Sequence, residues 1–156
     1  DRTAPPQNQS AAVQRPAQEA GVADPLGFVR ATYAQYLRTQ QGGDPPGYPE
    51  HAYSPRLRQL IAADRREGDM GALDFDYWIN GQDWQLSALE VEEVPPQDQR
   101  RVIVAHFRNF DRPVVSRFEF VPSGRRWLLD DVATEAQGDQ PGWRLSELLQ
   151  PERPAR

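Results

Sequence analysis

The sequence predicts an α+β domain, with N-terminal helices packed on a strongly curved antiparallel sheet. Three observations lead to this fold class. Segments in the first half of the chain repeat apolar residues at helical spacing. Four segments in the second half have the apolar, β-branched and aromatic pattern of strands. Clusters of Pro, Gly, Asp and Ser separate these strands, as turns do.

The helices have recognisable ends. The first is predicted from Asp24, which can cap it, to the glycines at 42–43. The second begins at Ser54–Pro55 and ends near Gly68. A short amphipathic helix is expected around Leu145–Leu149. The helices before the sheet are expected to lie in its concave face.

The second half of the chain is predicted to be an antiparallel meander. Phe118 and Phe120 flank Glu119, which indicates one buried and one wet face. The turns are expected at residues 95–98, 111–113 and 122–125. The predicted strands are Gln85–Val94, Arg101–Phe110, Val114–Val121 and Arg126–Val132.

The chain is predicted to hold one domain with two extensions. Residues 1–24 are rich in Gln, Ala and Pro and cannot bury enough apolar surface to offset their ordering entropy, so they are expected to form a flexible leader or tether. Residues 25–150 form the α+β domain, and residues 151–156 a tail. The chain begins at Asp1, as a mature protein does after removal of a signal peptide, so we expect export.

The composition limits the classes of partner and cofactor that we expect. The 156 residues carry a net charge of −5 and no cysteine, which leaves neither a disulfide framework nor a thiolate zinc site. All 18 basic residues are arginine, and they are scattered among 23 acidic residues, so nucleic acid is not an expected partner. No run approaches the roughly 20 apolar residues of a transmembrane segment. We expect no metal and no cofactor, and a monomer or homodimer.

Several motifs together carry a family resemblance: Phe28–Tyr33, Tyr53–Leu57, Asp74–Asp76, Gln82–Trp84 and Arg126–Val132. They resemble the bacterial family catalogued as domain of unknown function 3828, over about residues 25–150. The resemblance implies a nuclear transport factor 2-like, cone-like fold and a periplasmic or envelope-associated protein. It brings no established enzymatic mechanism.

The aromatic and acidic stretch from Leu73 to Trp84 is the most suggestive part of the sequence, and a short helix or an ordered loop is expected there. One interpretation is a pocket mouth, with aromatic walls for an apolar or sugar-like ligand and carboxylates that orient it. The other is a core-capping loop, whose carboxylates accept hydrogen bonds from backbone amides. A calcium loop is a third, although the EF-hand signature is absent. The candidate ligand- or partner-binding residues are Tyr33, Asp74, Asp76, Trp78, Asp83, Trp84 and His106.

No residues are predicted to be catalytic. His51 and His106 are the only histidines, and neither has the context of a triad or a metal site. Asp76 or Asp83 could pair with Tyr33 as an acid–base couple. Near the end of the last strand, one interpretation places Asp130 in the pocket. The favoured one has Trp127 filling the core, with Asp130 and Asp131 solvated.

Three functions follow from these patterns. The first is a noncatalytic exported domain that binds a protein partner or a small ligand. Its specific form is an immunity protein that neutralises a cell-wall-degrading toxin, a role assigned to some proteins that resemble the family. The alternatives are an isomerase- or dehydratase-type enzyme with a carboxylate in the cone pocket, and a structural envelope protein with a lipid tether upstream.

Overall fold

The computed structural model describes residues 20–150. The predicted tail at 151–156 and the predicted leader up to residue 19 lie outside this range. Within it, the α+β class is confirmed: α-helices precede and follow a five-stranded open antiparallel sheet.

The helices begin where the sequence predicts. The first, α2, spans Pro25–Thr39, and α3 spans Pro55–Arg66. Ser54 caps α3, because its hydroxyl accepts a hydrogen bond from the Leu57 amide at 3.1 Å. Asp24 occupies the N-cap position of α2, as predicted, but its side chain makes no capping hydrogen bond. The remaining helices are η2 at Glu50–Ala52, η3 at Gly68–Met70 and α4 at Leu145–Leu148.

The strands pair in chain order, β1-β2-β3-β4-β5, and every pairing is antiparallel. The turns are tighter than predicted, because positive φ angles at Asp98, Gln99, Phe110 and Asp111 allow two-residue connections. The strands β1, β3 and β4 therefore run longer than predicted, whereas β2 keeps its predicted length and is shifted by one residue. The strands are β1 Leu86–Gln97, β2 Arg100–Asn109, β3 Arg112–Ser123, β4 Arg126–Thr134 and β5 Trp143–Arg144.

The prolines at 95–96, predicted to lie in a turn, belong instead to β1. This strand is first in the sheet order, and within residues 20–150 it pairs only with β2. A proline lacks the amide hydrogen that a central strand needs, but an edge strand tolerates it.

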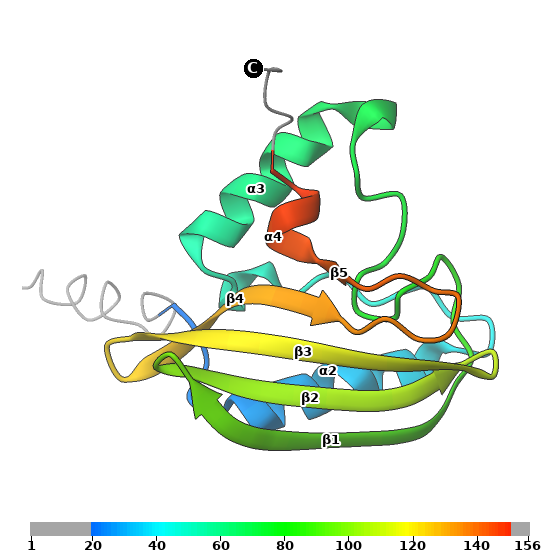
Figure 1. Ribbon diagram of the computed structural model, residues 1–156, viewed down its shortest axis with the longest axis horizontal. Coiled ribbons are helices and arrows are strands. Elements are labelled where there is room, and N and C mark those ends of the chain that lie inside the picture. Colours follow the sequence, from blue (N-terminus) through cyan, green and yellow to red (C-terminus); the bar gives the residue numbers. More distant parts are fainter. Residues whose placement is uncertain (1–19, 151–156) are drawn as a thin grey trace, which may run out of the picture.

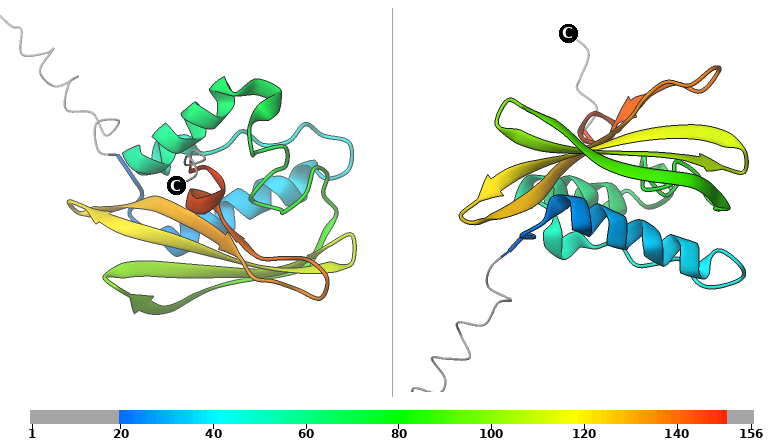
Figure 2. Two further views of the ribbon diagram at one scale, coloured as in Figure 1. Left: turned by 45° about the horizontal axis from the view of Figure 1, so that its top comes forward. Right: turned by 90° about the horizontal axis from the view of Figure 1, so that it is seen from below.

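The helices α2 and α3 lie on one face of the sheet, whereas α4 lies beside β4. In Figure 1, α2 runs behind the sheet, while α3 and α4 lie beyond β4. The right-hand view of Figure 2 shows α2 and α3 together below the twisted strands. The face of β1, β2 and β3 toward the viewer in Figure 1 carries no helix of the described residues.

Aromatic rings fill the space between α2 and the sheet. Tyr33, from α2, packs against Trp78 and Phe107 with centroid distances of 5.5 and 5.3 Å. Trp78 stacks on Phe118 at 4.5 Å. These four side chains are at most 3% exposed, so they form the centre of the core.

The folded part includes residues assigned to the leader by the sequence prediction. Val22 and Trp127 exchange two backbone hydrogen bonds of 2.8 Å each. Val22 also packs against the core. The polypeptide is therefore already tied to β4 before α2 begins.

Candidate functional site

The acidic-aromatic segment, residues 73–84, is an ordered loop. This is one of the two predicted conformations, the other being a short helix. Asp76 and Gly81 form an antiparallel bridge that closes a turn between them. The Asp76 amide donates to the Gly81 carbonyl at 2.8 Å. The loop thus has its own backbone frame, from which its side chains project in different directions.

The Asp76 carboxylate faces protein groups. One oxygen accepts from the Tyr36 hydroxyl at 2.6 Å, and the other from the Trp78 amide at 2.8 Å. Burial raises the pKa of Asp76 above its ordinary value, although these hydrogen bonds act in the opposite direction. The contact with the Trp78 amide is the one that the capping interpretation predicts, and the Tyr36 hydroxyl occupies the other oxygen.

Asp83 and Trp84 also contact backbone groups. An Asp83 carboxylate oxygen accepts from the Trp84 amide at 2.9 Å, and the Trp84 indole donates to the Tyr36 carbonyl at 2.9 Å. The carboxylate of Asp74 is exposed and has no hydrogen-bond partner among residues 20–150. Of the three acidic residues in the segment, only Asp74 presents an unoccupied carboxylate.

Tyr33 and Trp78 lie in the core, each 0% exposed. The Tyr33 hydroxyl donates to the Trp78 carbonyl at 2.5 Å, and the Trp78 indole donates to the Tyr53 hydroxyl at 3.0 Å. The predicted couple of Tyr33 with Asp76 or Asp83 is therefore not formed. The candidate residues do not converge on one site.

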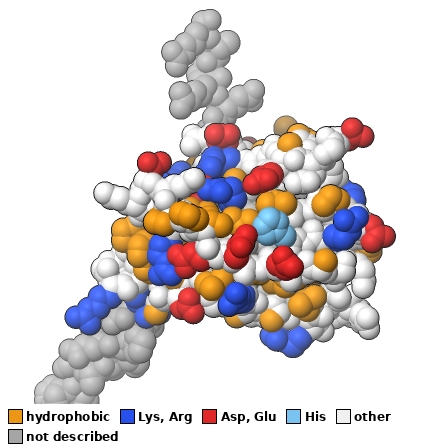
Figure 3. Space-filling model, turned by 60° about the horizontal axis from the view of Figure 1, so that its bottom comes forward, with side chains coloured by type: hydrophobic (Ala, Val, Ile, Leu, Met, Phe, Trp, Pro, Cys, Tyr) orange, Lys and Arg blue, Asp and Glu red, His pale blue; other side chains and the backbone are white. Residues whose placement is uncertain are grey.

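His106 lies on the uncovered sheet face, away from the acidic-aromatic segment. Its Nε2 is 3.5 Å from a carboxylate oxygen of Glu92 on the neighbouring strand β1. Figure 3 shows the side of the molecule on which β1 comes forward, with acidic side chains around a histidine and hydrophobic side chains among them. The imidazole, with its side chain 45% exposed, is a surface group of this face.

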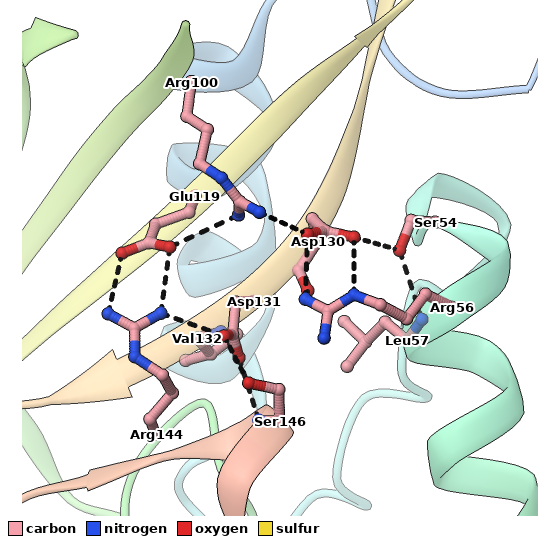
Figure 4. A network of polar contacts seen from close by, with 10 residues as sticks. All are labelled: Ser54, Arg56, Leu57, Arg100, Glu119, Asp130, Asp131, Val132, Arg144 and Ser146. Carbon is pink, nitrogen blue, oxygen red and sulfur yellow. Dashed lines mark hydrogen bonds and ion pairs between the residues drawn. The ribbon is translucent and has the colours of Figure 1, made fainter. Parts of the chain in front are cut away.

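A network of arginines and carboxylates joins the sheet to α3 and α4 (Figure 4). Its carboxylates are Glu119, Asp130 and Asp131, which are 8%, 6% and 3% exposed. The prediction that Asp130 and Asp131 are solvated is wrong, and so is the assignment of Glu119 to a wet face. The groups that neutralise them are Arg56, Arg100 and Arg144, with the hydroxyls of Ser54 and Ser146.

The network is arranged in two linked halves. Arg144 makes a two-pronged contact with Glu119, at 2.9 and 3.0 Å, and reaches Asp131 at 2.9 Å. Arg100 bridges to the second half through Asp130 at 2.9 Å. These contacts raise the pKa of Arg144, with the Glu119 hydrogen bonds as the main cause. Every carboxylate is paired, so the network is structural in its geometry.

Trp127 does not fill the core as predicted. It is half-buried at the start of β4, with the guanidinium of Arg101 5.2 Å from its ring centroid. Its backbone holds Val22. The ring therefore covers the edge of the core rather than its centre.

A concave surface with several apolar lining residues lies between α2 and β1, and we call it the α2–β1 groove. It has a volume of about 410 Å³. Leu37 is 41% exposed there, one of few large apolar side chains that reach the surface of the described chain. Its lining residues are Arg30, Ala34, Leu37, Leu89, Glu90 and Val91.

One side of β1 has no strand partner among residues 20–150. The Arg30 guanidinium, from α2, donates to the Val91 carbonyl at 3.1 Å. Glu90 is exposed and forms no ion pair within the described chain. The groove and this strand edge run side by side, and together they form the candidate functional site.

The sequence analysis did not single out these groove residues. Leu37 could be placed on the apolar stripe of the first helix, but not its exposure. Pro95 and Pro96 were the available signal that β1 is an edge strand, because prolines are confined to such strands.

Comparisons with family models, curated proteins and solved structures find no match to this chain. The resemblance to the domain of unknown function 3828 thus stays a prediction. Within residues 20–150, no group of three or more His, Asp or Glu is placed to hold a metal ion. In the same range, no helix has the length and apolar character needed to cross a membrane.

Proposed function

We propose that this protein is a noncatalytic, exported bacterial binding domain whose partner is a protein. The partner is bound as an extended segment along the edge of β1, over the α2–β1 groove. A groove between a helix and an unpaired strand edge supports this proposal, because such an edge offers backbone hydrogen bonds and the groove offers pockets for alternate side chains.

The charges near the edge indicate the chemistry of the partner. Glu90, Glu92 and Glu93 all lie on β1, and the whole chain has a net charge of −5. Glu93 is paired with Arg101, whereas Glu90 has no ion pair within residues 20–150. A segment that alternates basic and apolar residues complements both the acids and the groove, and its charge speeds association.

The specific form of the proposal is an immunity protein that neutralises a cell-wall-degrading toxin in the periplasm. An acidic surface suits a basic enzyme as a partner. The cone-like, nuclear transport factor 2-like arrangement also belongs to the proposal, and α2 packed on one side of a twisted sheet supports it.

The environment of Asp76 argues against the enzymatic alternative. An isomerase- or dehydratase-type enzyme needs a carboxylate that reaches the substrate. Both oxygens of Asp76 accept hydrogen bonds from Tyr36 and Trp78, and the core beside it is filled with rings. A structural envelope protein remains the alternative, which a lipidated cysteine upstream of Asp1 in the precursor would favour.

The test compares two substitutions, each of which replaces an exposed apolar side chain by arginine. Leu37→Arg places a charge in the groove, and Met70→Arg makes a similar change at a side chain that is 83% exposed in η3. Immobilised wild-type protein should retain a specific partner from periplasmic extract, Met70→Arg should retain it equally, and Leu37→Arg should retain at most about a tenth. Equal retention by both variants, or no specific partner with wild type, would overturn the proposal.

A further inference from the structure

A second groove, separate in its lining from the α2–β1 groove, lies where the acidic-aromatic segment meets β3 and β5. We call it the Trp143 groove, and its volume is about 390 Å³. It combines aromatic rings with polar side chains of both charges. The lining residues are Asp74, Phe75, Asn80, Gly81, Arg112, Gln140, Pro141 and Trp143.

The aromatic part of this groove is held in place before any ligand arrives. The indole of Trp143 donates to the Asn80 side-chain oxygen at 3.0 Å. Phe75 meets Trp143 edge to face, with a centroid distance of 5.4 Å. Trp143 is also paired with Thr134 in the sheet. Three separate contacts therefore fix one half-buried indole, which lowers the entropic cost of binding against it.

The polar part of the groove is unoccupied by protein partners. Arg112 is exposed at the start of β3 and forms no hydrogen bond or ion pair within residues 20–150. The Asp74 carboxylate is likewise without a partner in that range. This contrasts with the network of Figure 4, where every guanidinium is paired with a carboxylate. The groove thus presents one free donor group and one free acceptor group beside fixed rings.

We infer that the Trp143 groove binds a neutral, hydroxyl-rich oligosaccharide built of pyranose rings. The apolar C–H face of a pyranose packs on an aromatic ring, and its hydroxyls both donate and accept. Asp74 accepts from hydroxyls, Arg112 donates to them, and the Gln140 amide does both. Because one positive and one negative side chain line the groove, neither an anion nor a cation is favoured by charge. An open groove also suits a chain of sugars better than an enclosed small molecule.

Titration of the ¹⁵N-labelled protein with chitohexaose and cellohexaose tests this inference. The indole N–H resonance of Trp143 and the amides of residues 74–81 should shift with at least one of the two sugars. Arg112→Ala and Asp74→Asn should each weaken that binding about tenfold, because each removes a charge-assisted hydrogen bond. Arg58→Ala, which changes an exposed arginine of α3 outside the groove, should leave it unchanged.

The inference is overturned if neither sugar at millimolar concentration shifts the groove resonances. Equal binding by wild type and both groove variants would also overturn it. So would groove resonances that shift with inorganic phosphate but not with sugars. Arg112 and Asp74 are exposed, so their variants should fold, and the unchanged spectrum of the core confirms it. Trp143→Phe, which keeps an aromatic ring, should retain part of the sugar affinity.

Discussion

The environment of Asp130 differs from the one that the sequence analysis predicted. Its carboxylate accepts from Ser54 at 2.7 Å and from Arg56 at 2.8 Å, and it lies 2.9 Å from Arg100. Burial alone would raise its pKa, but the hydrogen bonds and the neighbouring positive charges outweigh burial and lower it. The ionised carboxylate therefore stabilises the folded state.

The sign of this shift predicts a pH dependence. A lowered pKa contributes stability above the ordinary value of 3.8, and that stability is lost as the pH falls through the lowered pKa. Asp130→Asn should reduce the free energy of unfolding at pH 7 by about 2 kcal/mol, allowing for the exposure of Arg56. The difference from wild type should shrink in urea titrations at pH 3. Asp44→Asn, at an exposed loop carboxylate, should change neither value, and a constant difference across pH would contradict the account.

Gln99 illustrates strain that composition does not reveal. It lies in the turn between β1 and β2 with φ of +64°, which costs a residue with a β-carbon energy that glycine avoids. Gln99→Gly should therefore raise the free energy of unfolding by about 0.5–1 kcal/mol. The same change at Gln35, an exposed position inside α2, should lower it by about 1 kcal/mol. Urea unfolding measures both, and a shared sign would contradict the strain assignment.

The N-termini of α2 and α3 differ in how they are capped. Ser54 caps α3 and also donates to Asp130, whereas the Asp24 side chain makes no capping hydrogen bond at α2. Ser54→Ala should cost about 1–2 kcal/mol. Asp24→Ala should cost less than about 0.5 kcal/mol, the remaining contribution coming from the helix dipole. Thermal unfolding of the two variants distinguishes them, and equal losses would show that Ser54 is not a functional cap.

Element types were predictable because they depend on local patterns. The helix starts at Pro25 and Pro55 and the four long strands follow from proline position and apolar spacing. The turns were placed too broadly, because two-residue connections here use Gln99 and Phe110 at positive φ, where such residues are rarely found. Pro122 and Arg112 were consequently assigned to turns rather than to β3.

Contacts between distant segments were not predictable from local patterns. Asp130 and Arg56 are far apart in sequence, and only the packing of α3 beside β4 brings them together. The same holds for the Trp143 groove, which joins Asp74, Arg112 and Trp143 from three separate segments. Sequence analysis identified Asp74 as a candidate, but it grouped Asp74 with the buried Trp78 rather than with Arg112.

In the whole molecule, one face of the sheet packs against α2 and α3, and the opposite face of β1, β2 and β3 carries no helix of the described residues. Arginine–carboxylate pairs stabilise the β4 side, where α3 and α4 attach (Figure 4). At the other end of the sheet, β1 has an edge that no strand of residues 20–150 pairs with. Arg30 donates to the Val91 carbonyl there, and the groove lies beside it. We therefore propose β1 as the place where the proposed protein partner binds.

A titration of the ¹⁵N-labelled protein with a synthetic decapeptide of alternating valine and arginine tests this placement most directly. The account predicts shifts confined to β1 and to the groove side of α2, with slower amide hydrogen exchange along the free edge of β1. A decapeptide of alternating valine and glutamate should bind at least tenfold more weakly. The central claim is contradicted if the arginine peptide leaves β1 unshifted, or if both peptides shift the same residues equally.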